Sequence, residues 1–345
     1  MTKFNNQIVI VLGSHRSGTS VTTRLVSYLG FNLGENLMEP NNDNPKGYFE
    51  DIDIYNFNEK ILKLIKRSWY DSDSIDSKLL INLTKKNIFN EAITLIKKKI
   101  NHQKLIIIKD PRITILLPFW VKVFKKLNLN IKYVCSIRNP LDISLSLKIR
   151  DGFSINNSLN IWYRYTSQLL LDLKFKDAVF INFDNFKENL NKEIIKLEIF
   201  FNKKFTKESL EKFKSFYEKS LLHSKHKPKD FYDSNLISDL YKDIYSQCLD
   251  LSINYEVSSS NEKLIKKNVN KIVNTINSDP LFKNGMNDLW YKKNAIKNDH
   301  ALDNLLEQRD RAIIQINKLE TETIKKNNAL NALLEQRDRA ISQIT

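Results

Sequence analysis

Four short runs of mostly apolar residues, many of them β-branched, recur through the first two thirds of the chain. They lie at residues 8–12, 105–108, 131–137 and 178–183. Such runs, without regular alternation of apolar and polar positions, are typical of strands buried on both faces of a parallel sheet. Between them, segments such as 52–65 place apolar residues at helical spacing. The pattern predicts an α/β fold in three layers, with helices on both faces of a central parallel sheet.

The first run leads into a Gly/Ser-rich turn, and the turn leads into a helical pattern. Residues 13–18 read GSHRSG, and Ser17, Thr19 and Ser20 are available to cap the helix that follows. Backbone N–H groups at such a helix start lie at the positive end of the helix dipole, where an anion is stabilised. The turn therefore predicts a binding site for a phosphate or sulfate group.

This turn differs from the loop that binds nucleoside triphosphates. Gly13 and Gly18 keep the glycine spacing of GxxxxGK[ST], but Thr19 stands where the lysine belongs. The cation is Arg16, two residues before the second glycine. The string RSGTS at 16–20 resembles the loop that holds the 5′-phosphosulfate in sulfotransferases that use 3′-phosphoadenosine 5′-phosphosulfate (PAPS). By itself this loop leaves an ordinary Gly/Ser turn as the alternative.

A second motif follows the third apolar run, where residues 138–146 read RNPLDISLS. In sulfotransferases an arginine at a strand end and a serine eight residues later hold the 3′-phosphate of the cofactor, and Arg138 and Ser146 match that spacing. An arginine offers a charge-assisted fork to a dianionic phosphate, and the serine adds a hydroxyl donor. With two separate motifs in agreement, residues 5–230 resemble the PAPS-dependent sulfotransferase superfamily, in particular its bacterial members.

The resemblance implies a P-loop-like fold and transfer of a sulfuryl group from PAPS to a hydroxyl or amine, with a glycan or glycolipid as the expected acceptor. The residues expected to bind PAPS are Ser14, His15, Arg16, Ser17, Gly18, Thr19, Ser20, Arg138 and Ser146. No metal is expected, because arginines and backbone amides replace the magnesium ion of nucleoside triphosphatases. The family's strand, YEDL and helix unit has a counterpart near residue 183, with Phe183 in place of its usual tyrosine.

Candidate catalytic groups lie in two places, directly after the second apolar run and in an earlier loop. Lys109, Asp110 and Arg112 stand where that strand ends, the place at which open α/β sheets bind ligands. In the cytosolic branch of the superfamily a histidine here is the general base, and this chain lacks it. We expect Asp110 first, and Glu50 of the string KGYFE second, to be the base, with Arg16 and Lys109 assisting. An internal ion pair between Asp110 and Arg112 is the alternative.

Composition and charge indicate which partners and which location to expect for the protein. The 345 residues carry a net charge of +15, but lysine is abundant throughout, so basicity is poor evidence for a nucleic-acid partner and none is expected. Cys135 and Cys248 predict neither a disulfide framework nor a metal cluster, and no apolar run approaches the roughly 18–20 residues of a membrane span. A location in the cytoplasm, or at the inner membrane surface, is expected. A small-molecule kinase and an inactive sulfotransferase-like scaffold remain alternatives.

The last third of the chain differs in kind. His223 and His226 precede it in a basic stretch, without partner ligands at metal spacing, and are expected at a solvated surface. ALDNLLEQRDRAIIQI at 301–316 recurs as ALNALLEQRDRAISQI at 329–344, an offset of 28 residues or four heptads. This repeat favours a coiled coil, and through it a homo-oligomer, over a lone solvated helix. The expected organisation is a sulfotransferase domain at 1–230, a helical extension at 231–298 and a coiled-coil tail at 299–345.

Overall fold

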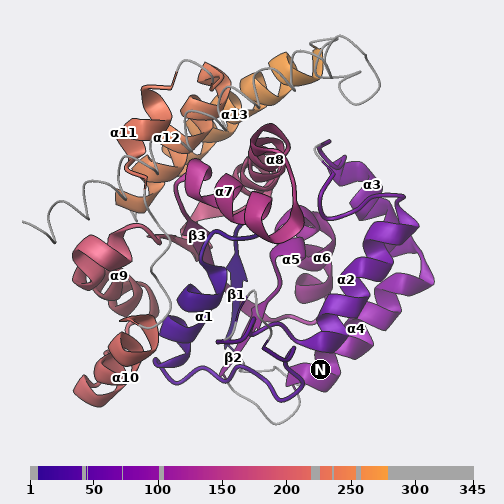
Figure 1. The fold of residues 1–345 in the computed structure, drawn as a ribbon. Helices are drawn as coiled ribbons and strands as arrows, with labels where there is room; N and C mark the ends of the chain where they lie inside the picture. Colours follow the sequence, from indigo (N-terminus) through magenta and orange to yellow (C-terminus); the bar gives the residue numbers. More distant parts are fainter. Residues whose placement is uncertain are drawn as a thin grey trace, which may run out of the picture. The chain divides into compact units, whose positions relative to one another are not determined.

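A four-stranded parallel sheet in the order β2-β1-β3-β4 lies at the centre of the computed structural model (Figure 1). The residues described are 7–40, 44, 46–71, 73–100, 105–218, 226–234, 237–253 and 258–278. The strands are β1 (Gln7–Leu12), β2 (Leu105–Lys109), β3 (Asn130–Ile137) and β4 (Ala178–Asn182). They coincide with the four apolar runs, so the predicted α/β fold with a central parallel sheet is confirmed.

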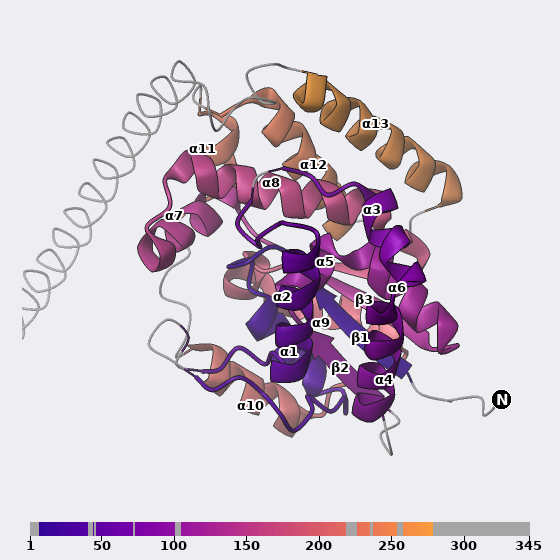
Figure 2. The ribbon, with the colours of Figure 1, turned by 90° about the vertical axis from the view of Figure 1, so that its right-hand side faces the viewer.

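Helices cover both faces of the sheet (Figure 1, Figure 2). Val9 and Val11 of β1 point into one apolar core together with α1 (Thr19–Ser27), α9 (Asn185–Phe201) and α10 (Lys207–Glu218). On the opposite face lie α8 (Ile155–Asp172) and α12 (Asp239–Ile253). The other helices are α2 (Ile52–Leu64), α3 (Ser77–Asn82), α4 (Asn87–Ile100), α5 (Pro111–Ile115), α6 (Leu117–Lys126), α7 (Pro140–Asp151), α11 (Pro228–Tyr232) and α13 (Ser259–Ser278), with 3-10 turns at Leu83–Lys85 and Phe175–Asp177.

The topology brings three strand ends together. β1 pairs in parallel with β2 on one side and β3 on the other, so that Val11 lies opposite both Lys109 and Val134. The chain passes from β1 to β2 and then crosses to the far side of β1, and open α/β sheets bind ligands at such a reversal. The loop 13–18, Asp110 and the segment starting at Arg138 therefore share one edge of the sheet.

The start of α1 differs from the expectation that Ser17, Thr19 or Ser20 would cap it. Its N-cap is Gly18, in a left-handed conformation, and no side chain of the described residues caps the helix. The hydroxyl of Ser17 instead donates to the carbonyl of Ser14, at 2.8 Å. None of the described side chains therefore caps the N–H groups of the first turn, and these groups can bind a ligand.

Beyond residue 230 the described chain is helical. α12 packs against β4 and α8, and α13 packs against α8. None of the helices in the described ranges is long and apolar enough to cross a membrane. The repeat at 301–344, and the coiled coil and oligomer predicted from it, lie outside the described residues.

Candidate functional site

The loop between β1 and α1 is held in shape by its own backbone and by neighbouring elements. The backbone N–H of Ser17 donates to the carbonyl of Ser14 at 3.3 Å. The N–H of Gly13 donates to the hydroxyl of Thr114 at 2.9 Å, and this hydroxyl donates to the carbonyl of Gly13 at 3.1 Å. From β3, the hydroxyl of Ser136 donates to the carbonyl of Ser17 at 2.7 Å. The loop is thus preformed at the edge where the strands end.

Both glycines of the loop are sterically required. A Cβ at Gly13 would lie 2.6 Å from the Ser17 hydroxyl oxygen and 2.7 Å from the carbonyl oxygen of Ser136. A Cβ at Gly18 would lie 2.2 Å from the ring of Phe183, and its φ of +85° already favours glycine. Arg16 also adopts a positive φ, 65°. Non-glycine residues in this region cluster at ligand-binding sites, where the surrounding structure holds them.

The structure brings the two sequence motifs together. The Arg16 Nε donates to the Ser146 hydroxyl at 2.7 Å, and the Arg138 Nη1 donates to the Arg16 carbonyl at 3.0 Å. The Phe183 ring packs against the Arg138 guanidinium, with the ring centroid 5.2 Å from the Cζ. The uncapped start of α1, two arginines and a serine therefore form one group of anion-binding donors.

Arg138 is buried and lies near two carboxylates, the buried Asp142 and the half-buried Asp184. Burial lowers its pKa, and Asp142 and Asp184 oppose that effect. Burial raises the pKa of Asp184 to about 7, although Arg138 acts in the opposite direction. The same carboxylate accepts the N–H of Asn139 at 2.7 Å, which fixes the start of α7. Arg138 is thus held at the end of β3 beside the carboxylates of Asp142 and Asp184.

His226 is buried, so its expected place at a solvated surface is wrong. Its Nδ1 hydrogen-bonds to Asp142, and the Asn139 side chain donates to the carbonyl of Lys227 at 3.0 Å. Through these contacts His226 and Lys227 pack against the start of α7. His223 lies outside the described residues.

A second cluster joins the KGYFE loop to α1. The Lys109 Nζ lies 2.5 Å from the Glu50 Oε1, 3.0 Å from the Tyr48 carbonyl and 3.4 Å from the Ser20 hydroxyl. The Arg112 Nη1 lies 3.7 Å from the other oxygen of Glu50. Burial raises the pKa of Glu50, although Lys109 opposes this. Lys109 thus places the Glu50 carboxylate near the first turn of α1.

Asp110 is 0% exposed, and both of its oxygens are occupied. One accepts the backbone N–H and the Nη1 of Arg112, each at 2.9 Å, and so caps α5. The other accepts the side-chain amide of Asn58 at 2.9 Å, and the Asn58 oxygen in turn accepts the Trp120 indole N–H at 2.8 Å. The internal ion pair considered as an alternative for Asp110 and Arg112 is present.

His15 is the loop's other titratable group. Burial, and then the cations Arg112 and Arg150, lower its pKa well below 6.5, so the ring is neutral at neutral pH. Its centroid lies 4.4 Å from that of Trp69. The Nε2 is buried, and no hydrogen-bond partner for it is found among the described residues.

Sequence reasoning missed Thr114 and Ser136, which support the loop, and did not predict the contact between Asn139 and Asp184. Ser136 carried a usable signal, because a hydroxyl inside a buried strand needs a hydrogen-bond partner. Thr114 carried none, since it lies 101 residues from the glycine that it contacts.

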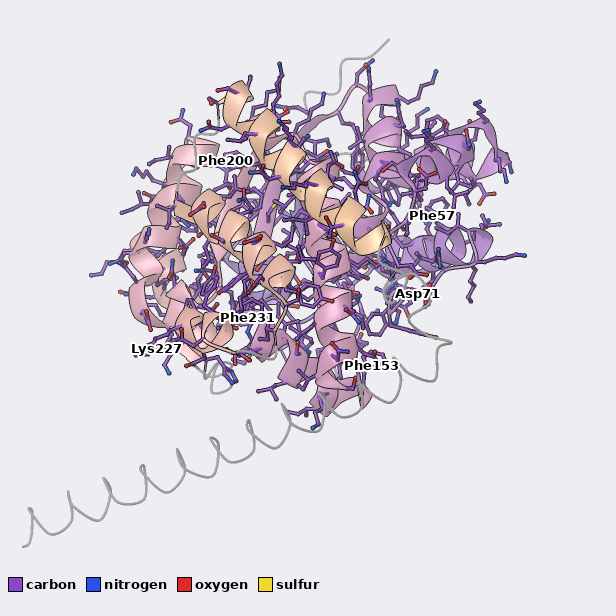
Figure 3. The ribbon with its side chains drawn as sticks, turned by 90° about the horizontal axis from the view of Figure 1, so that it is seen from above. Phe57, Asp71, Phe153, Phe200, Lys227 and Phe231 are labelled. Carbon is purple, nitrogen blue, oxygen red and sulfur yellow. The ribbon has the colours of Figure 1, made fainter. Side chains whose placement is uncertain are left out.

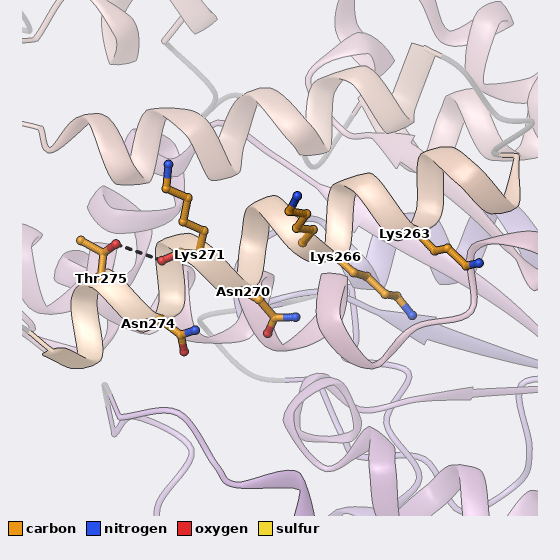
Figure 4. Close-up of a pocket in the computed structure, with 7 residues that line it drawn as sticks. Lys263, Lys266, Asn270, Lys271, Asn274 and Thr275 are labelled. Atoms are coloured by element: carbon orange, nitrogen blue, oxygen red, sulfur yellow. Dashed lines mark hydrogen bonds between the residues drawn. The ribbon is translucent and has the colours of Figure 1, made fainter.

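The described residues border two hollows, one beneath the loop and one along α13. The enclosed cavity beneath the loop, bordered by Ser14, Ser17 and Arg138, holds about 10 Å³, too little for a nucleotide. A hollow of about 830 Å³ runs along α13 and is bordered by the side chains drawn in Figure 4, Lys263, Lys266, Lys267, Asn270, Lys271, Asn274 and Thr275. None of the predicted site residues borders it. Within the described ranges, no group of His, Cys, Asp and Glu is placed to hold a metal ion.

No protein-family model matches the chain, and neither does any curated protein sequence. Solved structures that resemble it include the sulfotransferase domain of the Synechococcus PCC 7002 olefin synthase, at 15% identity and a TM-score of 0.38, covering 81% of this chain and 97% of that one. Sulfotransferase STF1 from Mycobacterium tuberculosis H37Rv is 12% identical with a TM-score of 0.37, over 70% of this chain and 77% of that one. Retinol dehydratase in complex with androsterone and the inactive cofactor PAP is 12% identical with a TM-score of 0.33, covering 81% of this chain and 82% of that one. At these values the likenesses assign no activity to this chain.

Proposed function

We propose that this protein is a sulfotransferase that moves a sulfuryl group from PAPS to a hydroxyl or amine of an acceptor, a glycan or glycolipid. The observation that carries the proposal is the meeting of the RSGTS loop with Arg138 and Ser146, through contacts of 2.7 and 3.0 Å. Each motif contributes a set of donors to this one group, and two adjacent sets suit a nucleotide with phosphate at both its 5′ and 3′ positions.

The chain's residues divide between the two ends of PAPS in this proposal. The amides at the start of α1 and Arg16 bind the 5′-phosphosulfate, and Arg138 with Ser146 binds the 3′-phosphate. PAPS supplies an activated sulfuryl group, bonded through oxygen to the 5′-phosphate. The acceptor oxygen or nitrogen forms a bond to sulfur as the bond from sulfur to the phosphate oxygen breaks. Fixed donors such as Arg16 and Lys109 stabilise the charge that develops on the leaving phosphate.

Glu50 is better placed than Asp110 to receive the acceptor's proton. Both Asp110 oxygens accept hydrogen bonds, from Arg112 and Asn58, whereas one Glu50 oxygen is hydrogen-bonded by Lys109 and the other lies 3.7 Å from the Arg112 Nη1. Its raised pKa also makes it a stronger base than an exposed carboxylate. We therefore assign the general base to Glu50 and a structural role to Asp110.

A binding comparison tests the proposal against the kinase alternative. The full chain is titrated calorimetrically with adenosine 3′,5′-bisphosphate and, separately, with ATP and Mg²⁺. We expect the bisphosphate to bind at least about tenfold more tightly, a difference of about 1.4 kcal/mol, because the loop lacks the lysine that holds the terminal phosphates of ATP. Equal or tighter binding of ATP would contradict the proposal. Transfer of labelled sulfur from PAPS to a glycan mixture then separates an active enzyme from an inactive scaffold.

A further inference from the structure

An aromatic group borders the phosphate loop without a role in the chemistry above. We call Trp69, Tyr70 and Phe153 the aromatic platform. The ring centroids of Trp69 lie 5.5 Å from Tyr70 and 5.9 Å from Phe153, and Tyr70 lies 5.9 Å from Phe153. Trp69 also contacts His15 of the loop, at 4.4 Å. The platform therefore extends from the loop outward to Tyr70, which is 51% exposed.

The turn that carries Trp69 and Tyr70 is held in place by hydrogen bonds from two side chains of α8. Arg164 is only 1% exposed, and its Nη1 donates to the carbonyls of Ser68 at 3.1 Å and Asp71 at 2.5 Å. The hydroxyl of Tyr165 donates to the carbonyl of Trp69 at 3.1 Å. The N–H of Ser68 donates to the Asp71 carboxylate at 2.8 Å and closes the turn. These bonds hold the rings before a ligand arrives, which reduces the entropy lost on binding.

The other side of the platform comes from the chain segment that carries the second motif. Phe153 follows α7, the helix of Ser146, and Figure 3 shows Phe153 and Asp71 on the same side of the molecule. Arg150, in the last turn of α7, lies with its Cζ 5.4 Å from the centroid of Trp69. The Nε and Nη2 of Arg150 also lie 2.8 Å from the Asp151 carboxylate, so the platform lies beside an ion pair, close to the loop.

We infer that the aromatic platform binds a sugar ring of the acceptor. This inference rests on the proposed function, because it takes the acceptor to approach the phosphate loop. The electron-rich face of an aromatic ring attracts the C–H groups on the apolar face of a pyranose, while hydroxyls at the sugar's edge stay in water or meet Arg150 and the Tyr70 hydroxyl. The half-exposed Tyr70 leaves the platform open, as suits one ring of a longer glycan; a small phenol is better bound in an enclosed apolar slot.

The inference is tested by saccharide binding without any donor nucleotide. The full chain is titrated by NMR or calorimetry with a panel of neutral and amino-sugar hexasaccharides, and with tyrosine amide as the phenol probe. At least one hexasaccharide should bind, and Y70A and F153A should each weaken it about three- to tenfold, as expected for the loss of one aromatic contact. Y70F, which keeps the ring, should retain most of the affinity. I149A, at an 85% exposed position on α7, is the control and should change nothing.

The outcomes separate this inference from the proposed function. Adenosine 3′,5′-bisphosphate should bind all four variants as it binds the wild type, because none alters the phosphate loop. Saccharide binding without bisphosphate binding would overturn the sulfotransferase proposal and leave the platform standing. Failure of every hexasaccharide, tyrosine amide binding in their place, or unchanged affinity in both Y70A and F153A would overturn the platform.

Discussion

At the level of single residues, Glu50 and Asp110 show how surroundings separate two buried carboxylates. Asp110 accepts hydrogen bonds on both oxygens and caps α5, so its charge stabilises the folded structure. Glu50 pairs with Lys109 beside the start of α1, and burial raises its pKa. The sequence favoured Asp110 because it directly follows a strand, but sequence position does not reveal how many partners a carboxylate already has.

E50Q should therefore affect mainly turnover, and D110N mainly the stability of the fold. E50Q should lower kcat by about 10²- to 10⁴-fold, the usual contribution of a general base, with bisphosphate affinity little changed. D110N should lower the free energy of unfolding by about 1–3 kcal/mol, because it weakens the buried pair with Arg112 and turns an amide N–H₂ or an uncharged oxygen toward the Asn58 amide, while Arg112 keeps Glu59 at 2.5 Å. Turnover, calorimetric binding and denaturant unfolding measure these effects.

The matched control is E91Q, which removes a carboxylate from an exposed pair with Lys60 and should alter neither property. Wild-type turnover should rise with pH through the Glu50 pKa, above the ordinary 4.5, because a base acts only when deprotonated. Full turnover in E50Q together with its loss in stable D110N would return the role to Asp110.

At the level of elements, the unit of β1, loop and α1 could be read from the sequence almost in full. An apolar run predicts the strand, and glycine spacing predicts the turn, because both depend on local patterns. The N-cap was predicted wrongly, since the left-handed Gly18 takes the place expected for a capping side chain. The burial of His226 could not be predicted either, because it depends on Asp142, 84 residues earlier in the chain.

The tight contact between Gly18 and Phe183 leads to a prediction for this unit. G18A should weaken bisphosphate binding by at least about tenfold, because its Cβ would meet the Phe183 ring at 2.2 Å and displace the loop. The control is G30A, at a glycine with a similar φ of +89° and no atom within 4 Å of the added Cβ. Both variants carry a backbone strain of about 1 kcal/mol, visible in thermal unfolding. Equal bisphosphate affinity in the two would show that the contact with Phe183 has no part in shaping the site.

At the level of the whole molecule, the site exists because a parallel sheet gathers distant segments. Arg16 and Arg138 lie 122 residues apart in sequence, yet they meet because β1 and β3 are neighbours whose carboxyl ends share an edge. The sequence predicted a parallel sheet but not the strand order β2-β1-β3-β4, because the apolar runs do not show which strands are neighbours. The supporting contacts of Thr114 and Asp184 arise only from the packed structure.

The central claim, that Arg138 holds the 3′-phosphate of PAPS, is tested most directly by calorimetry on R138A. Adenosine 3′,5′-bisphosphate and adenosine 5′-phosphosulfate are titrated into the wild type, R138A and the surface control R67A, whose arginine pairs with the exposed Asp73. A charged hydrogen bond contributes about 1.5–3 kcal/mol, so R138A should bind the bisphosphate about 10- to 150-fold more weakly. Adenosine 5′-phosphosulfate, which lacks the 3′-phosphate, should lose much less, and R67A should bind both as the wild type does. Equal weakening of the two nucleotides by R138A would contradict the account.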